Sequence, residues 1–186
     1  AQDLNMPLSL HTATSRVGPN RGVAASSVRI ASGRANKVFL PSTSLCDIIF
    51  SGVFDRYPKL KVAVVEFELA WAAHLLGTMD YTYIERQKEA SYRFKGDTLP
   101  SDFFHQNVYL SFQEDQVGIR LRDVIGVDGL MWGSDYPHSE ATFPRSQEIL
   151  DKILAGVGEE DRAKIVGLNA ANLYNFDLDV LSTGSV

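Results

Sequence analysis

Residues 61–66 read KVAVVE and carry the clearest strand pattern in the sequence. A run of valine and alanine without polar interruption is typical of a parallel strand buried on both faces, whereas a strand with one solvated face alternates apolar and polar residues. Three further short segments have strand character, and they lie at 8–11, 108–112 and 130–135. Helical patterns separate these four segments, so the sequence predicts β/α units around a parallel sheet.

The segments between the strands contain one long loop and several amphipathic helices. Residues 12–37 are rich in Ser, Gly, Asn and Arg and are expected to form a loop. Ser42 or Ser44 is the expected N-cap of the next helix, and apolar residues recur at every fourth position from Trp71 to Tyr83. The helices are expected at about 45–54, 71–87, 117–126, 147–155 and 160–174, and the polar tail 177–186 is expected to be frayed.

Composition excludes several classes of protein. The 186 residues are 45% hydrophobic, enough for a single domain spanning 1–186 with a buried core, and 18 Lys+Arg against 23 Asp+Glu give a net charge of −5. This balance argues against binding to nucleic acid or anionic lipid. The sequence has no bilayer-length apolar run and no signal-peptide pattern, and its single cysteine, Cys46, allows no intrachain disulfide. We therefore expect a soluble cytoplasmic protein.

Chemically capable side chains follow the first and the last strand segments. His11 ends the first segment, and Asp135 ends the last, with His138 three residues further on. Because parallel strands present their carboxyl ends at one edge of a sheet, these groups are expected to converge on one site, as metal ligands or as acid/base groups. The alternatives are that His11 is an ordinary hydrogen-bonded loop residue and that Asp135 accepts backbone hydrogen bonds in a turn.

Two carboxylates follow the valine-rich strand. Glu66 ends it, and Glu68 would project to the same side if the chain stayed extended. Glu66 could ligate a metal, orient a water molecule or act as a base, or the two residues could be an acidic pair favoured by the dipole of the following helix. His74, within a helix, is expected to serve packing, and His105 is expected to be exposed. Neither is assigned a role.

Several common chemistries lack their sequence motifs. The chain contains no P-loop, no dinucleotide-binding glycine pattern, no Cys-x-x-Cys and no Gly-x-Ser-x-Gly nucleophile elbow. Nucleotide-dependent and acyl-serine mechanisms are therefore not favoured.

Four stretches resemble the carboxyl-terminal half of amidohydrolase family 2, which includes aminocarboxymuconate semialdehyde decarboxylase and the γ-resorcylate-type decarboxylases. They are FSGVFDRYPKLK (50–61), Glu66 with Trp71, LMWGSDYPH (130–138) and NAANLY (169–174). These stretches follow one another in the same order as in that family, and the resemblance covers residues 8–176.

The resemblance implies an α/β fold of the (β/α)8 TIM-barrel type, present as a partial barrel that contains strands five to eight. It makes His11 and Asp135 metal ligands, gives Asp135 the further role of holding or deprotonating a water molecule on the metal, and places His138 in the substrate pocket. Zn²⁺ is the first candidate for the metal and Mn²⁺ the second. From the residues alone, Arg16, or else Arg21 or Arg34, could pair with a substrate carboxylate.

The sequence departs from that family in two ways. The paired histidines of the first barrel strand have no counterpart, so we expect a truncated product, an environmental fragment, or a half that pairs with another chain or forms a homo-oligomer. Glu66 replaces the strand-six histidine of the decarboxylases. The expected function is a metal-dependent hydrolase or nonoxidative decarboxylase acting on a small carboxylated or cyclic substrate; the alternative is a non-catalytic half-barrel that dimerises and has no complete metal site.

Overall fold

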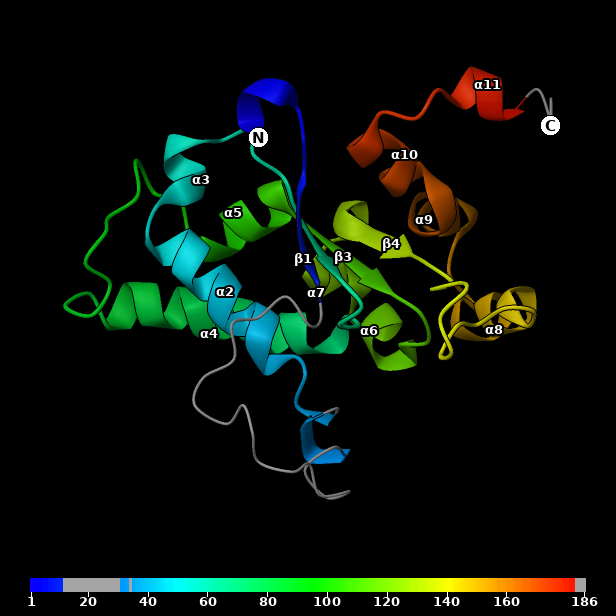
Figure 1. Cartoon of the computed structure of the whole chain (residues 1–186). Helices are drawn as coiled ribbons and strands as arrows, with labels where there is room; N and C mark the ends of the chain where they lie inside the picture. The colour runs from blue at the N-terminus through cyan, green and yellow to red at the C-terminus, as the bar shows by residue number, and fades with distance from the viewer. Residues whose placement is uncertain (12–30, 34, 183–186) are drawn as a thin grey trace, which may run out of the picture.

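A computed structural model describes residues 1–11, 31–33 and 35–182. Its centre is one parallel sheet of four strands in the order β1-β2-β3-β4 (Figure 1). The strands are β1 (Leu8–His11), β2 (Val62–Val65), β3 (Val108–Phe112) and β4 (Leu130–Trp132). The four predicted strands and the α/β fold class are thus confirmed.

Helical segments precede, connect and follow the strands (Figure 1). They are η1 (Gln2–Leu4), α2 (Phe39–Phe50), α3 (Val53–Arg56), α4 (Ala70–Glu85), α5 (Pro100–Asn107), α6 (Gln116–Arg120), α7 (Arg122–Ile125), η2 (Val127–Gly129), α8 (Ser146–Ile153), α9 (Glu159–Ala163), the π-helical turn η3 (Lys164–Leu168), α10 (Asn169–Tyr174) and α11 (Leu178–Ser182). Within the described ranges, no helix combines the length and the apolar character needed to cross a bilayer.

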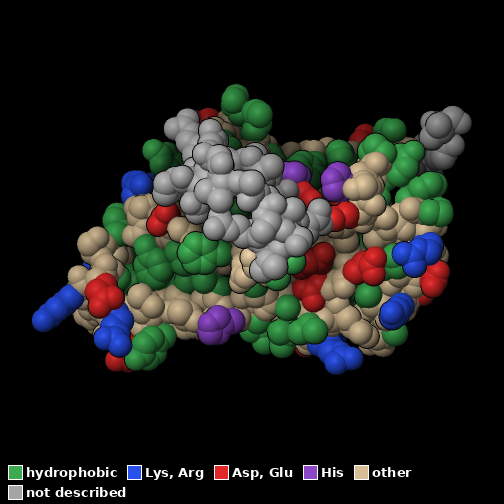
Figure 2. Space-filling view, turned by 60° about the horizontal axis from the view of Figure 1, so that its bottom comes forward, with side chains coloured by type: hydrophobic (Ala, Val, Ile, Leu, Met, Phe, Trp, Pro, Cys, Tyr) green, Lys and Arg blue, Asp and Glu red, His purple; other side chains and the backbone are tan. Residues whose placement is uncertain are grey.

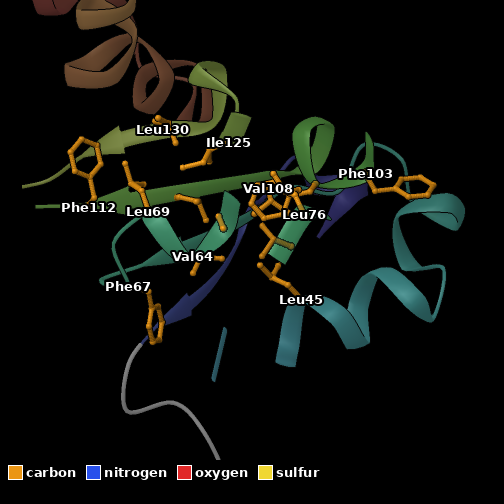
Figure 3. Close-up of a cluster of buried hydrophobic side chains, with 14 of the residues drawn as sticks. Leu45, Val64, Phe67, Leu69, Leu76, Phe103, Val108, Phe112, Ile125 and Leu130 are labelled. Carbon is orange, nitrogen blue, oxygen red and sulfur yellow. The ribbon is translucent and has the colours of Figure 1, made fainter. Parts of the chain in front are cut away.

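The core explains why the valine-rich segment is a central strand. On one face of the sheet, Val64 and Val108 pack with Leu45 of α2 and Leu76 of α4 in the main hydrophobic cluster (Figure 3). On the other face, Ala63 belongs to a smaller cluster with Met131 and Leu173. Strand β2 therefore needs apolar residues at successive positions, as the sequence predicted.

The first long helix is displaced from its expected position. It begins at Phe39, not near Leu45, because Pro41 lies in the first turn, where a missing N–H costs no intrahelical bond. Ser42 therefore lies inside the helix and donates its hydroxyl to the Val38 carbonyl instead of serving as a cap. Gly52, at φ 72°, separates α2 from α3.

Other expected boundaries also differ. The predicted loop 12–37 is helical at 31–33 and 35, and residues 12–30 lie outside the described part. Helix α5 was missed, although Pro100 at its first position and Asp102, whose side chain accepts the Leu99 N–H, are start signals. The tail expected to be frayed contains α11, because the Asp177 carboxylate accepts backbone N–H groups at the start of this helix.

A buried asparagine holds the turn that leads into β4. The Asn169 side chain is almost fully buried, and its Nδ2 donates to the carbonyls of Val127 and Leu130, at 2.8 Å in both cases. We expect Asn169→Ala to lower the free energy of unfolding by about 2–3 kcal/mol, because a buried carbonyl, that of Leu130, and a part-buried one, that of Val127, lose their donor. Denaturant unfolding measures this loss. Asn172→Ala is the matched control, since Asn172 is exposed on the same helix; an equal loss in both variants would contradict the prediction.

Candidate metal centre

The carboxyl ends of β1 and β2 bring a histidine and a glutamate together. His11 is paired with Val65 across the two strands, so it lies beside the residue that precedes Glu66. Its Nε2 is 3.1 Å from Oε2 of Glu66. The Glu66 side chain is mostly buried, at 16% exposure, whereas that of His11 is half exposed. The sequence analysis placed both residues at one edge of the sheet and did not foresee that they form a pair.

The end of β4 supplies an aspartate and a second histidine. The β-ladder continues one residue past β4, because the Gly133 N–H donates to the carbonyl of Phe112. The chain then turns at Asp135, and Nδ1 of His138 lies 3.1 Å from Oδ2 of Asp135. In the space-filling view of Figure 2, histidine and acidic side chains lie next to one another near the upper middle of the face shown.

Two of these acidic residues have an unusual backbone conformation. Glu66 has φ 71° and Asp135 has φ 59°, a left-handed region that residues other than glycine seldom adopt. Such conformations cost of order 1–3 kcal/mol each and persist where the surrounding structure enforces them, often at functional sites. Both residues line the same small cavity at the ends of the strands.

The donor atoms form a compact set that fits a metal ion. One ligand atom each from Glu66, Asp135 and His138 lie within 4.8 Å of one another. Asp135 Oδ2 is buried, yet it accepts no hydrogen bond from the described residues, since His138 lies close but out of hydrogen-bond alignment. Carboxylate oxygens with imidazole nitrogens are the donors that divalent zinc and manganese take in proteins. His11 lies next to this group, in contact with Glu66, and is not itself one of the three residues whose ligand atoms lie within 4.8 Å of one another.

A small cavity lies beside these donors. It has a volume of about 110 Å³, and Glu66, Asp135, Ser111 and Gln113 are among the residues that line it. The Ser111 hydroxyl accepts the Glu66 N–H at 3.4 Å, and the Gln113 side chain donates to the Glu140 carbonyl at 3.2 Å. Sequence analysis assigned no role to Ser111 or Gln113. Both stand at the carboxyl end of a predicted strand, which is where functional residues lie in parallel sheets.

Glu68 does not face the same way as Glu66, because the chain after β2 is not extended. Glu68 has φ 60°, and its carboxylate accepts the Gln113 N–H at 3.3 Å. Burial raises the pKa of Glu68, and the nearby Asp115 carboxylate raises this pKa further. Asp115 itself accepts the N–H groups of Leu69 and Ala70, so it fixes the turn that carries both glutamates.

The raised pKa of Glu68 predicts a pH-dependent stability difference. A carboxyl whose pKa is higher in the folded state stabilises the fold below its unfolded pKa of about 4.3, and this contribution is lost as pH rises through the folded pKa. We therefore expect Glu68→Gln to unfold at a higher temperature than the wild type at pH 7 and the two melting temperatures to converge toward pH 4. A lower melting temperature for Glu68→Gln at pH 7 would contradict this prediction. Thermal melts across the pH range measure the difference.

The other sequence-based candidates are placed as follows. Arg16, proposed as a partner of a substrate carboxylate, lies outside the described residues, as do Arg21 and Arg34. His105 is exposed, as expected. His74 is also exposed, so its expected packing role is wrong; it lies on the solvent side of α4, away from the stripe of buried residues.

The chain is similar in sequence and in fold to known proteins. The family model described as amidohydrolase matches residues 1–176. An amidohydrolase from Mycobacterium avium subsp. paratuberculosis is 25% identical, with a TM-score of 0.66 over 92% of this chain and 43% of that chain. The 5-carboxyvanillate decarboxylase from Sphingomonas paucimobilis is also 25% identical, with a TM-score of 0.62 over 73% of this chain and 40% of its own.

A third solved structure is similar in fold. A 5-carboxyvanillate decarboxylase from Novosphingobium aromaticivorans, complexed with manganese and 4-hydroxy-3-methoxy-5-nitrobenzoic acid, has a TM-score of 0.70 and 19% identity over 94% of this chain and 49% of that chain. This chain thus spans about half the length of the solved structures it matches, and its four parallel strands form a partial (β/α)8 barrel. Since the family model covers nearly the whole sequence, the chain belongs to the amidohydrolase family.

Proposed function

We propose that this chain is the carboxyl-terminal part of a metal-dependent hydrolase that acts on a small cyclic or carboxylated substrate. The observation that carries this proposal is the convergence of His11, Glu66, Asp135 and His138 at the carboxyl ends of β1, β2 and β4. In parallel β/α folds, ligands bind at this end of the strands. Membership of the amidohydrolase family supports the same location.

The proposed metal ligands are His11 and Asp135. A divalent cation held there would supply Lewis-acid activation of water and of a substrate carbonyl group. Zn²⁺ was the first expectation, but a second carboxylate, that of Glu66, lies beside Asp135. Carboxylates suit Mn²⁺ well, and one relative in fold is complexed with manganese. We therefore propose Mn²⁺ first and Zn²⁺ second.

The chain's own residues provide the acid and base groups for hydrolysis. The carboxylate of Asp135 is the proposed base that takes a proton from an attacking water molecule. Glu66 acts as a second carboxylate beside the cavity, and its contact with His11 orients that imidazole. His138, half exposed beside Asp135, is the proposed substrate-binding residue, and Arg16 is the proposed partner of a substrate carboxylate.

A second candidate function is nonoxidative decarboxylation of an aromatic acid. It is favoured by the similarity, at 25% identity, to a 5-carboxyvanillate decarboxylase. In this chain a decarboxylase would have to protonate the substrate carbon with a residue other than a histidine at the end of β2, since Glu66 stands there. This difference places hydrolysis first.

The whole protein that contains this chain tests these functions. Metal-free protein should be inactive and should recover activity on addition of Mn²⁺. Hydrolysis of cyclic amides or esters is measured by the acid released, and decarboxylation of aromatic acids is measured by the CO₂ released. Turnover of an ester or amide would support the first function, and CO₂ release the second. No metal-dependent turnover of either class would contradict both.

The rival proposal is a non-catalytic half-barrel that dimerises through its sheet edges. Within the described residues, β1 pairs only with β2, and β4 pairs only with β3. The rival predicts a stable dimer without bound metal, so mass in solution and metal content together separate it from the enzyme.

We propose that 1–186 is one domain that pairs with an amino-terminal half and binds a small molecule. We also propose that it works in the cytoplasm, as its single cysteine suggests.

A further inference from the structure

We infer that the chain binds a divalent cation through Glu66, Asp135 and His138, with His138 ligating through Nδ1. This inference rests on the proposed metal-dependent function and extends it, because it adds Glu66 and His138 as ligands and so gives His138 a metal-binding role in place of the substrate-binding role proposed above. It also means that the four-stranded unit binds the cation without ligands from another chain. Nδ1 of His138 and Oδ2 of Asp135 face each other at 3.1 Å.

Nδ1 of His138 faces two neighbours. It accepts the backbone N–H of Glu140 at 3.4 Å, as an imidazole nitrogen with a lone pair can. The same Nδ1 is 3.1 Å from Asp135 Oδ2, which is also an acceptor and receives no hydrogen bond. A cation placed beside these two atoms would be bound by both of them, and the same cation would lie within reach of Glu66, whose ligand atom is within 4.8 Å of theirs.

The separation of the two atoms is that of neighbouring ligands. In octahedral coordination, which Mn²⁺ takes, bonds of about 2.1–2.2 Å at a right angle place two ligand atoms about 3.0–3.1 Å apart. The distance from His138 Nδ1 to Asp135 Oδ2 is 3.1 Å, and the distance from His11 Nε2 to Glu66 Oε2 is also 3.1 Å. The long contact with the Glu140 N–H is weak enough for a cation to replace it.

Rigid elements hold the proposed ligands. Asp135 and Glu66 are fixed by their left-handed backbone at the ends of two strands. The loop that carries His138 is tied to the end of β3, where the Gln113 side chain donates to the Glu140 carbonyl. The adjacent cavity of about 110 Å³ leaves room for water molecules to complete the coordination of the ion.

The first test is Mn²⁺ binding to the metal-free 186-residue chain by isothermal titration calorimetry. We expect one Mn²⁺ per chain and at least a 10-fold loss of affinity in Glu66→Gln and in His138→Gln. His138→Asn should retain more affinity than His138→Gln, because the Asn oxygen falls near the position of Nδ1 and the Gln oxygen near that of Nε2. His74→Gln, a change of an exposed histidine on α4, is the control and should bind as the wild type does.

A second test needs no variant and so does not depend on the variants' folding. In ¹⁵N-histidine NMR spectra of the wild-type chain titrated with Zn²⁺, a diamagnetic probe, we expect the Nδ1 resonance of His138 to shift while Nε2 stays protonated. A shift at Nε2 instead, no shift at His138, or Mn²⁺ affinity that is unchanged in Glu66→Gln and His138→Gln would overturn the inference.

The proposed function can fail separately from this inference. If the whole protein shows metal-dependent turnover and the chain binds no Mn²⁺ through these residues, the function stands and the inference is wrong. If Mn²⁺ binds as described and the whole protein has no metal-dependent turnover, the inference stands and the function is wrong.

Discussion

Asp135→Asn is expected to lower the metal-dependent turnover of the whole protein at least about 100-fold, since even residues that only support a metal ligand are worth 10- to 100-fold. Asparagine is nearly isosteric and tolerates the left-handed backbone that Asp135 adopts at φ 59°. The substitution therefore removes the negative charge and the proton-accepting oxygen with little change in the shape of the turn. Steady-state kinetics at saturating Mn²⁺ measures the loss.

Stability and metal content separate this chemical effect from misfolding. The melting temperature of metal-free Asp135→Asn should equal or exceed that of the wild type, because a buried carboxylate oxygen without a hydrogen bond is replaced by a neutral group. Alanine at the same position should lose activity too and should also be less stable, because it disfavours φ 59°. Wild-type turnover in Asp135→Asn would exclude Asp135 from the chemistry.

Phe104→Ala is expected to destabilise the fold by about 3–5 kcal/mol, the cost of removing a large aromatic side chain from a packed core. Phe104 lies on α5, is 1% exposed and belongs to the main cluster between the helices and the sheet. A loss of this size is a large fraction of the stability of a typical domain, so the variant should be largely unfolded under mild denaturing conditions. Urea unfolding followed by circular dichroism measures it.

An exposed phenylalanine provides the matched control. Phe39, at the start of α2, is 71% exposed, so Phe39→Ala should change the free energy of unfolding by no more than about 0.5 kcal/mol. Similar losses in both variants would mean that the cluster around Phe104 is not the core that stabilises this unit.

Much of the candidate site could be predicted from the sequence because strand ends in a parallel sheet share one edge. The apolar segments that end in His11, Glu66 and Asp135 carry their own signal, since a buried strand must be apolar over several successive residues. Helix boundaries were less predictable: Pro41 was compatible with the first turn of α2, and the start signals of α5 at Pro100 were short. These signals act over one turn and compete with tertiary packing.

The four parallel strands and the residues at their carboxyl ends could be predicted from local patterns, because burial on both faces of β2 and the alternation of strands with helices are visible along the chain. The pairing of Glu66 with His11, the contact of Glu68 with Gln113 and the contact of His138 Nδ1 with Asp135 became visible in the folded chain alone. Those pairings depend on left-handed backbone at Glu66 and Asp135, which contacts between strands far apart in the sequence hold in place.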